Sequence, residues 1–313
     1  MADHDGEARA AGPWPRWALD SRLLRHFLAV VHHGNMTAAA SALGLTQPAL
    51  SKSIQHLEQE LDVALFVRHA GGVTPTAYGG ALARRARLID AELARARAEI
   101  EAIRGGGAAV VRVGASPMWT AAYLPQAVAA LHRDLPRVQV RISSGVIDTL
   151  IPRVLGGELD LVCAAMDFPE HGELERESLL EAEHVLVVHR SHRLARRRAV
   201  AAAELLQYPW ATIGDDRVAM ARLGAYFSAS GVSQSRIDIE AQTLDALAGV
   251  LCNGPFIANI AAPNLEFFAA FGIVRLPIRG TLWRFRAGIV YRAAALADPT
   301  LSLLIAHLRA QVR

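Results

Sequence analysis

Cysteine and lysine are both scarce in this sequence of 313 residues. The two cysteines, Cys163 and Cys252, lie in apolar stretches and belong to no CxxC motif or Cys/His pair. This spacing excludes a disulfide framework and a cysteine-rich metal site, and it is typical of buried thiols in a reducing compartment. Lys52 is the only lysine, so arginine carries nearly all the positive charge. A net charge of +3 allows an anionic partner but does not by itself predict one.

Long uninterrupted hydrophobic runs are missing as well. The most apolar late stretch, residues 249–274, is broken by asparagine, proline and glutamate, which argues against a membrane-spanning helix. Residues 1–19 lack the basic and then apolar order of a signal peptide, and we expect them to form a disordered extension. Hydrophobic residues still make up 52% of the chain, enough for two or three units with cores of their own. We therefore expect a soluble, cytoplasmic protein.

Signatures of catalysis and of cofactor binding are also absent. The sequence contains no G-x-x-x-x-G-K-[ST] segment. Residues 114–118 depart from the nucleophile elbow G-x-S-x-G because Met118 stands at the fifth position. His184, His189 and His192 are close in sequence but unevenly spaced, which does not favour a metal site. The sequence thus predicts no catalytic residue, no metal and no cofactor.

Residues 20–61 have the pattern of three short helices. Apolar side chains follow helical spacing from Arg22 to His33, and Gly34 stands where a helix-ending glycine belongs. Asn35 can cap a second helix and Thr46 a third. The third helix has one apolar stripe, formed by Leu50, Ile54, Leu57 and Leu61. A helix, a tight turn and a helix in this order can present the last helix to the major groove of DNA.

The face opposite that stripe carries groups that can read DNA. An amide can pair with adenine, an ammonium with guanine or phosphate, and small apolar groups can contact thymine methyls. On the third helix we expect such contacts from Gln47, Pro48, Ala49, Ser51, Lys52 and Gln55. Further phosphate contacts are expected from the helix N-termini at Thr37 and Thr46 and from Arg68. A merely solvated helix face is the alternative. Because acidic residues balance the basic ones from Asp20 to Gly80, phosphate binding must rest on placed contacts.

A wing and a long helix are expected next. Residues 64–67 and 73–75 read as short extended segments around a turn-rich insert. From Thr76 to about Arg104 the apolar residues alternate by four and three positions: Leu82, Ala86, Ile89, Leu93, Ala96, Ile100 and Ile103. This seam predicts a dimerising helix, with an amphipathic helix packed within one chain as the alternative. Residues 105–107, all glycine, form a flexible joint.

The rest of the chain alternates between strands and helices. Apolar runs at residues 110–114, 138–142 and 159–164 are separated by helical patterns at 121–132 and 147–155. A second series runs from Val185 to Ile260, and further strands and a helix follow it. This order predicts parallel sheets in two α/β lobes. We place lobe I at about residues 108–166 and 266–313, and lobe II at about 167–265.

Several of these segments together resemble one family. The likeness is carried by residues 36–58, 61–68 and 74–79, and farther along by 113–116, 157–161 and 253–260. In this order they are similar to the signature of LysR-type transcriptional regulators. Asp62, in place of a common glycine, and Gly80, in place of a larger residue, depart from the family pattern. Neither departure lies in the helix that would read DNA.

The resemblance implies an α/β chain with three parts. These are a mostly α-helical winged helix-turn-helix (residues 20–80), a linker and dimerisation helix with its hinge (81–107), and a two-lobed effector domain like the type 2 periplasmic binding proteins (108–313). It implies a sequence-specific regulator that binds double-stranded DNA as a homodimer or homotetramer, at an operator with dyad symmetry. RNA polymerase is a further partner that the resemblance allows.

The resemblance also implies a ligand site between the lobes. Ligands of such folds collect at the carboxyl ends of the strands, where helix N-termini can receive an anion. Hydroxyl groups at these positions predict contacts to a small polar or anionic metabolite from Ser116, Thr120, Ser143, Ser144, Thr212 and Thr243. Helix capping is the alternative role for each. A solute-binding protein or an α/β enzyme of the same fold is the alternative for the whole chain, disfavoured because neither a signal peptide nor a set of catalytic groups is visible.

Overall fold

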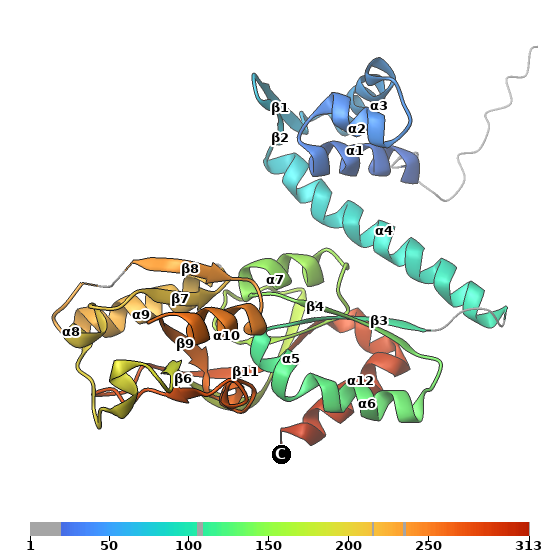
Figure 1. Cartoon of the computed structure of the whole chain (residues 1–313). Coiled ribbons are helices and arrows are strands. Elements are labelled where there is room, and N and C mark those ends of the chain that lie inside the picture. The colour runs from blue at the N-terminus through green and yellow to red at the C-terminus, as the bar shows by residue number, and fades with distance from the viewer. Residues whose placement is uncertain (1–19, 105–108, 215, 234–235, 313) are drawn as a thin grey trace, which may run out of the picture. The chain divides into compact units, whose positions relative to one another are not determined.

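The chain forms two compact units joined through one long helix. The computed structural model describes residues 20–104, 109–214, 216–233 and 236–312, and Figure 1 traces the whole chain. The two units divide within the long helix, after Leu93. The predicted N-terminal extension (1–19) and glycine joint (105–107) lie outside the described residues.

Three helices form the core of the first unit, as the sequence predicts: α1 (Ser21–His33), α2 (Met36–Ala42) and α3 (Gln47–Leu61). The predicted caps form. Asn35 Oδ1 accepts the backbone N–H groups of Thr37 and Ala38 at 2.8 and 3.1 Å, and Gly34 ends α1 with a φ of 60°. The α3 stripe of Leu50, Ile54 and Leu57 is fully buried in the shared core. The opposite face of α3 is therefore turned outward.

The wing is a hairpin of β1 (Phe66–His69) and β2 (Gly72–Pro75), paired antiparallel. Two sets of hydrogen bonds hold it to the helices. Glu58 Oε1 on α3 accepts the N–H groups of Leu65 and Phe66 at 2.7 and 3.3 Å, and the Val73 N–H donates to the carbonyl oxygen of Gly34 at 2.8 Å. The orientation of the wing is thus set by α1 and α3.

The long helix α4 (Ala77–Ile103) begins against this wing. Thr76 caps it, because its Oγ1 accepts the Gly79 N–H at 3.1 Å. The first part of the predicted seam packs inside the unit, where Ala86 is buried and Leu82 is half-buried. Farther along, Ile89, Leu93 and Ile100 are 43%, 48% and 57% exposed. The seam therefore serves the core of this unit at its start and presents bare apolar side chains beyond it.

The second unit is built on one mixed sheet, with strand order β4-β3-β5-β11-β6-β9-β7-β8 and β10 paired to β6. Lobe I holds β3 (Val110–Ala115), β4 (Gln139–Ser144) and β5 (Leu161–Ala165), with helices α5 (Pro117–Ala122), α6 (Leu124–Asp134), α7 (Ile147–Leu155) and α12 (Pro299–Gln311). Lobe II holds β7 (Trp210–Ile213), β8 (Ile237–Ala241), β9 (Ile257–Ala261) and β10 (Ile273–Arg275), with α8 (Ala202–Leu205), α9 (Arg217–Ala229), α10 (Leu244–Asn253) and α11 (Leu265–Ala269). The second unit also contains three short 3-10 helices: η1 (Arg193–Arg196), η2 (Ala262–Asn264) and η3 (Ala293–Ala297).

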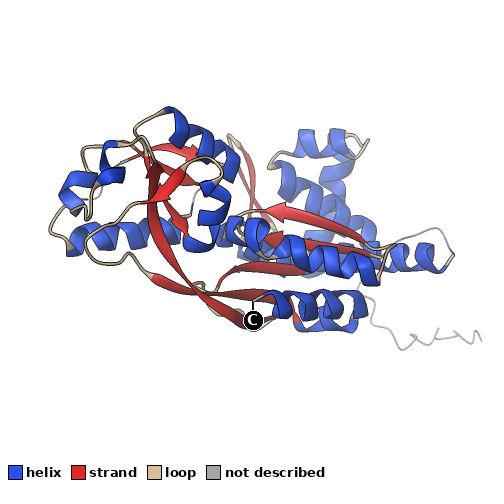
Figure 2. Ribbon diagram, turned by 60° about the horizontal axis from the view of Figure 1, so that its bottom comes forward, coloured by secondary structure: helices blue, strands red, loops and turns tan. Residues whose placement is uncertain are grey.

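Two long antiparallel strands, β6 (Leu174–His189) and β11 (Arg284–Arg292), join the lobes. The first part of β6 pairs with β11, whose other edge pairs with β5 in lobe I. The last part of β6 pairs with β9 and β10 in lobe II. Figure 2 shows these strands as continuous ribbons that run from one lobe into the other.

The structure moves the predicted lobe boundaries. Phe268 and Ile273 pack in the core of lobe II, so residues 266–283 belong there rather than to lobe I. Residues 174–180 of β6 pair with lobe I, although the sequence suggested lobe II. Only Val185–His189 of β6 was expected to be a strand. The first part of β6 was missed because its charged residues interrupt the apolar pattern. The expected helix at 121–132 is also two helices, α5 and α6, which meet at Tyr123.

Adjacent glycines at the start of α4 give a matched test of the first unit. A Cβ at buried Gly79 would lie 2.1 Å from the carbonyl oxygen of Leu65, whereas a Cβ at Gly80 would meet nothing within 4 Å. We expect Gly79→Ala to lower the free energy of unfolding by about 1 to 3 kcal/mol, because α4 must move off the loop before the wing. Gly80→Ala should raise it by about 0.5 to 1 kcal/mol through helix propensity.

Urea unfolding of the full chain, with hydrogen exchange at the α1 to α3 amides to identify the unit that unfolds, measures both effects. Equal stability of the two variants would contradict the packing described here.

Candidate functional site

The outward face of α3 collects most of the residues predicted to read DNA. Gln47, Pro48, Ala49, Lys52 and Gln55 are exposed, and Ser51 is half-buried. The Gln47 amide nitrogen donates to Ser51 Oγ at 2.8 Å, which orients the Gln47 side chain along the helix. Because the opposite stripe is fully buried, these polar side chains are held on a rigid support.

The N-termini of α2 and α3 are partly used by their own caps. The backbone N–H of Thr37 is taken by Asn35, so the exposed hydroxyl of Thr37 remains for an outside partner. Thr46 Oγ1 accepts the Ala49 N–H at 3.4 Å. Arg68 is exposed on β1 of the wing, apart in sequence from these helices.

Charge is separated along α3 rather than cancelled locally. The Glu58 carboxylate is occupied by the backbone of the loop before the wing, and Glu60 lies 3.3 Å from His56 Nε2. Both acids belong to the C-terminal half of the helix. The half that begins at Gln47 carries Lys52 as its one charged residue, so an anionic backbone can approach it without meeting a carboxylate on that half of the helix.

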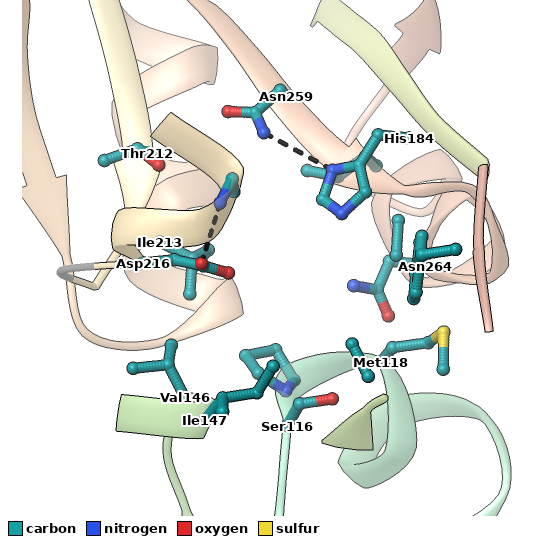
Figure 3. Close-up of a pocket in the computed structure, with 16 residues that line it drawn as sticks. Ser116, Met118, Val146, Ile147, His184, Thr212, Ile213, Asp216, Asn259 and Asn264 are labelled. Carbon is teal, nitrogen blue, oxygen red and sulfur yellow. Dashed lines mark hydrogen bonds between the residues drawn. The ribbon is translucent and has the colours of Figure 1, made fainter. Parts of the chain in front are cut away.

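A pocket lies between the lobes of the second unit (Figure 3). Its lining comes from Ser116, Pro117, Met118, Val146, Ile147 and Ala165 of lobe I, from Thr212, Ile213, Asp216, Ala219, Asn259, Ile260, Ala261 and Asn264 of lobe II, and from His184 and Phe285 on the two strands that join the lobes. The space is about 670 Å³ when its open mouth is included. Both lobes therefore contribute to the walls of this pocket.

Two of the six predicted hydroxyl residues, Ser116 and Thr212, line this pocket. Ser116 precedes α5, and its side chain makes no capping bond to that helix. Thr212 is buried in β7. The capping alternative therefore does not describe the Ser116 hydroxyl.

The other four predicted hydroxyl residues do not line the pocket. Thr120 Oγ1 donates to the carbonyl oxygen of Pro117 at 3.1 Å, and Thr243 caps α10 by accepting the Ala246 N–H. Ser143 Oγ accepts from Arg153, and Ser144 is exposed at the end of β4. The capping alternative describes Thr243. The pattern of strands and helices in the sequence does not separate these four positions from Ser116.

His184 is the central polar residue of the pocket. It stacks on Trp283 with ring centroids 4.3 Å apart and lies 5.1 Å from the Phe285 ring. Burial among these rings lowers the pKa of His184 to about 3, so the imidazole is neutral near pH 7. Its Nδ1 lies 3.3 Å from the amide nitrogen of Asn259. Because that nitrogen is a donor, Nδ1 accepts and the proton of the neutral ring is on Nε2.

Sequence reasoning passed over the amides and the acid of this pocket. From the sequence, Asn259 and Asn264 count as interruptions of the apolar stretch 249–274, and Asn259 also lies in a segment that resembles the family, but neither they nor Asp216 is predicted to contact a ligand. The available signal was an asparagine inside a strand that is otherwise apolar, Ile257–Ala261, since such an amide needs a partner when buried.

The arrangement can bind a small ligand. Cys163 is fully buried in β5, and burial raises the pKa of its thiol far above the ordinary range, so it stays protonated. Among the described residues no cluster of three histidine, cysteine or acidic side chains could hold a metal ion. Within that same part of the chain, no helix is both long and apolar enough to cross a membrane.

Comparison with protein families assigns both units. Residues 21–80 match the bacterial regulatory helix-turn-helix protein model of the lysR family, and residues 104–313 match the LysR substrate binding domain. Among curated proteins, the chain is 32% identical over 264 residues to the HTH-type transcriptional regulator GbpR of Azospirillum brasilense, covering 82% of this chain and 77% of GbpR. It is 26% identical to the regulator GalR of Pseudomonas putida, covering 94% of this chain and 75% of GalR.

Solved structures share the fold over nearly the whole length. The LysR family regulator CbnR is 23% identical with a TM-score of 0.64, covering 94% of this chain and all of CbnR. A full-length OxyR from Pseudomonas aeruginosa is 19% identical with a TM-score of 0.60, covering 94% of this chain and 95% of OxyR. CbnR has also been solved with its target DNA, and that structure has a TM-score of 0.61 to this chain.

These relatives are transcriptional regulators, and they support neither a solute-binding protein nor an enzyme. Helix-turn-helix, linker helix and two-lobed α/β domain occur in the order that the sequence predicts. The chain belongs to the LysR family of transcriptional regulators, with a DNA-binding helix-turn-helix and a domain that binds a small-molecule effector.

Proposed function

We propose that α3 reads the operator and that an effector bound in the pocket between the lobes modulates this regulator. Base contacts come from Gln47 and Gln55, with Pro48 and Ala49 against thymine methyls. Phosphate contacts come from Lys52, Ser51, Arg68 and the hydroxyls of Thr37 and Thr46. The observation that supports this assignment is the exposed polar row of α3, backed by a fully buried stripe.

We further propose a function for each segment of the chain. Residues 20–80 form the DNA-reading domain, residues 81–107 the dimerising linker, and residues 108–313 the effector domain, all acting in the cytoplasm. The effector contacts Ser116 and Thr212, which line the pocket.

Substitutions on α3 test the DNA assignment. We expect Gln47→Ala to weaken specific operator binding by about 1 to 3 kcal/mol, because one base contact is lost. Lys52→Ala should weaken specific and nonspecific binding alike and reduce the salt slope by about one ion. Gel-shift titrations of the full chain at several salt concentrations separate the two effects.

Gln59→Ala is the matched control, since Gln59 is exposed at the C-terminal end of the same helix. It should leave affinity unchanged. If Gln47→Ala and Gln59→Ala bind operator equally well, another element reads the bases.

Adjacent positions on α4 test the assembly. Leu93 is 48% exposed on the apolar seam, whereas Ala94 is exposed one position away from it. In a dimer that buries this seam, Leu93→Glu places a carboxylate against apolar side chains and shifts the dimer toward monomer by about tenfold or more in the dissociation constant. Ala94→Glu should shift it little.

Sedimentation of the two variants at matched concentrations measures the difference. Unchanged dimerisation of Leu93→Glu would exclude this helix as the interface.

A further inference from the structure

The pocket between the lobes lacks the charge that an anionic effector needs. Among the described residues that line it, Asp216 is the only one with a charged side chain, and none is an arginine or a lysine. The neutral His184 adds no positive charge. A carboxylate in this pocket would therefore meet a like charge and no cation, which is unfavourable in a partly dehydrated site.

Helix N-termini could in principle replace a cation, and four helices begin at the pocket wall: α5, α7, α9 and the short α11, whose first turn carries Glu266. At α9 the Asp216 carboxylate itself accepts the Ala219 N–H at 2.9 Å and so occupies that N-terminus. The first turn of α7 contains Asp148, whose negative charge already interacts favourably with the positive end of the helix dipole.

At α5 the first residue, Pro117, has no N–H, and the N–H groups of Trp119 and Thr120 donate to the carbonyl oxygen of Ser116. The Ser116 N–H donates to the carbonyl oxygen of Cys163 at 2.8 Å. The cradle of backbone donors that a carboxylate would need at Ser116 is thus largely taken.

Two amides make a further part of the pocket wall polar but uncharged. Asn259 and Asn264 are 5% and 3% exposed, and the side-chain oxygen of each is buried without a hydrogen-bond partner among the described residues. A buried carbonyl oxygen without a donor costs about 1 to 3 kcal/mol. Figure 3 shows both amides and the His184 ring around the same open space. Because these oxygens are closed off from solvent, the two amides add polarity to the wall without adding charge.

The pocket itself offers hydrogen-bond donors. His184 Nε2 carries the ring proton, and the hydroxyls of Ser116 and Thr212 can donate or accept. Met118, Ile147 and Ile260 are among several apolar residues of the lining. The chemistry is that of a neutral site with an apolar wall, in which one head group both gives and receives hydrogen bonds.

We propose that the effector is an uncharged molecule with an apolar body and an alcohol or carboxamide head group, rather than a carboxylate. This inference rests on the proposed role of the pocket as the effector site. It differs from the small polar or anionic metabolite that the sequence led us to expect, because the hydroxyl residues behind that expectation are mostly outside the pocket.

Matched probes test the head group. The full chain is titrated by calorimetry and by thermal shift with phenylacetate, phenylacetamide and 2-phenylethanol, and then with butyrate, butyramide and 1-butanol. In at least one of the two series, phenyl or aliphatic, the neutral probes should bind about tenfold more tightly than the acid. Tighter binding of both acids would overturn the inference while leaving the pocket as an effector site. If no probe of either series binds at millimolar concentration, the proposed role of the pocket fails together with the inference.

A variant that lacks the Asp216 charge tests whether the probes bind in this pocket. Asp216→Asn removes the charge that Asp216 brings to the described part of the lining and keeps a helix cap, since asparagine caps as well as aspartate. It should narrow the preference for the neutral probes over the acid by about fivefold, because the repulsion of the acid is gone. Asp298→Asn is the control, as Asp298 caps α12 by accepting the Thr300 N–H at 2.8 Å and does not line the pocket. An identical preference in both variants would overturn the assignment.

A second variant tests the amides. Asn264→Leu replaces an amide whose oxygen has no described partner by an apolar side chain of similar size. It should leave the melting temperature unchanged or raise it, and weaken the neutral probes by about fivefold or more. A lower melting temperature with unchanged probe binding would mean that Asn264 serves the fold and not the ligand.

Discussion

The antiparallel pairing of β6 with β11 is the constraint on which the second unit depends. These two strands belong to both lobes, so the pairing fixes how the lobes face each other. The register shifts between Ala287 and Gly288, where a Cβ would lie 1.9 Å from the carbonyl oxygen of Glu177. Only glycine permits this close approach. The pocket follows from the pairing, because His184 and Phe285 stand on these strands between the walls that each lobe contributes.

The first unit is organised by a simpler constraint, the burial of one stripe of α3. Once Leu50, Ile54 and Leu57 are packed against α1 and α2, the polar face of α3 has no freedom to turn inward. Hydrogen bonds that the Glu58 carboxylate accepts from Leu65 and Phe66 then hold the wing to the same helix. A weakly charged domain can bind DNA in this way because its few polar groups are held in place rather than because it is strongly basic.

The two proposed sites differ in how they would meet their ligands. The α3 face is open, carries one lysine, and has its acids at the other end of the helix. The pocket lies between the two lobes, and its described lining has one carboxylate, a neutral imidazole and two amides. Electrostatic attraction suits the first site, whose partner is a polyanion. Hydrogen bonding and apolar contact suit the second, where burial makes any unpaired charge costly.

The sequence by itself determined the helices and caps of the first unit and the residues of its exposed face. Spacing at Leu50, Ile54 and Leu57 and the caps at Asn35 and Thr46 are local, and a helix converts such local spacing directly into faces. It also determined most strands and helices of the second unit.

The membership of the pocket was decided only by the tertiary structure. His184, Asp216, Asn259 and Asn264 come from separate elements, and what brings them together is strand order and lobe crossing, neither of which leaves a local pattern. The hydroxyls of Thr120, Ser144 and Thr243 also lie near strand ends or helix starts, yet they do not line the pocket. Ser144 is at the same end of the parallel strands β3 and β4 as Ser116, so strand order does not say which side chain points into the pocket.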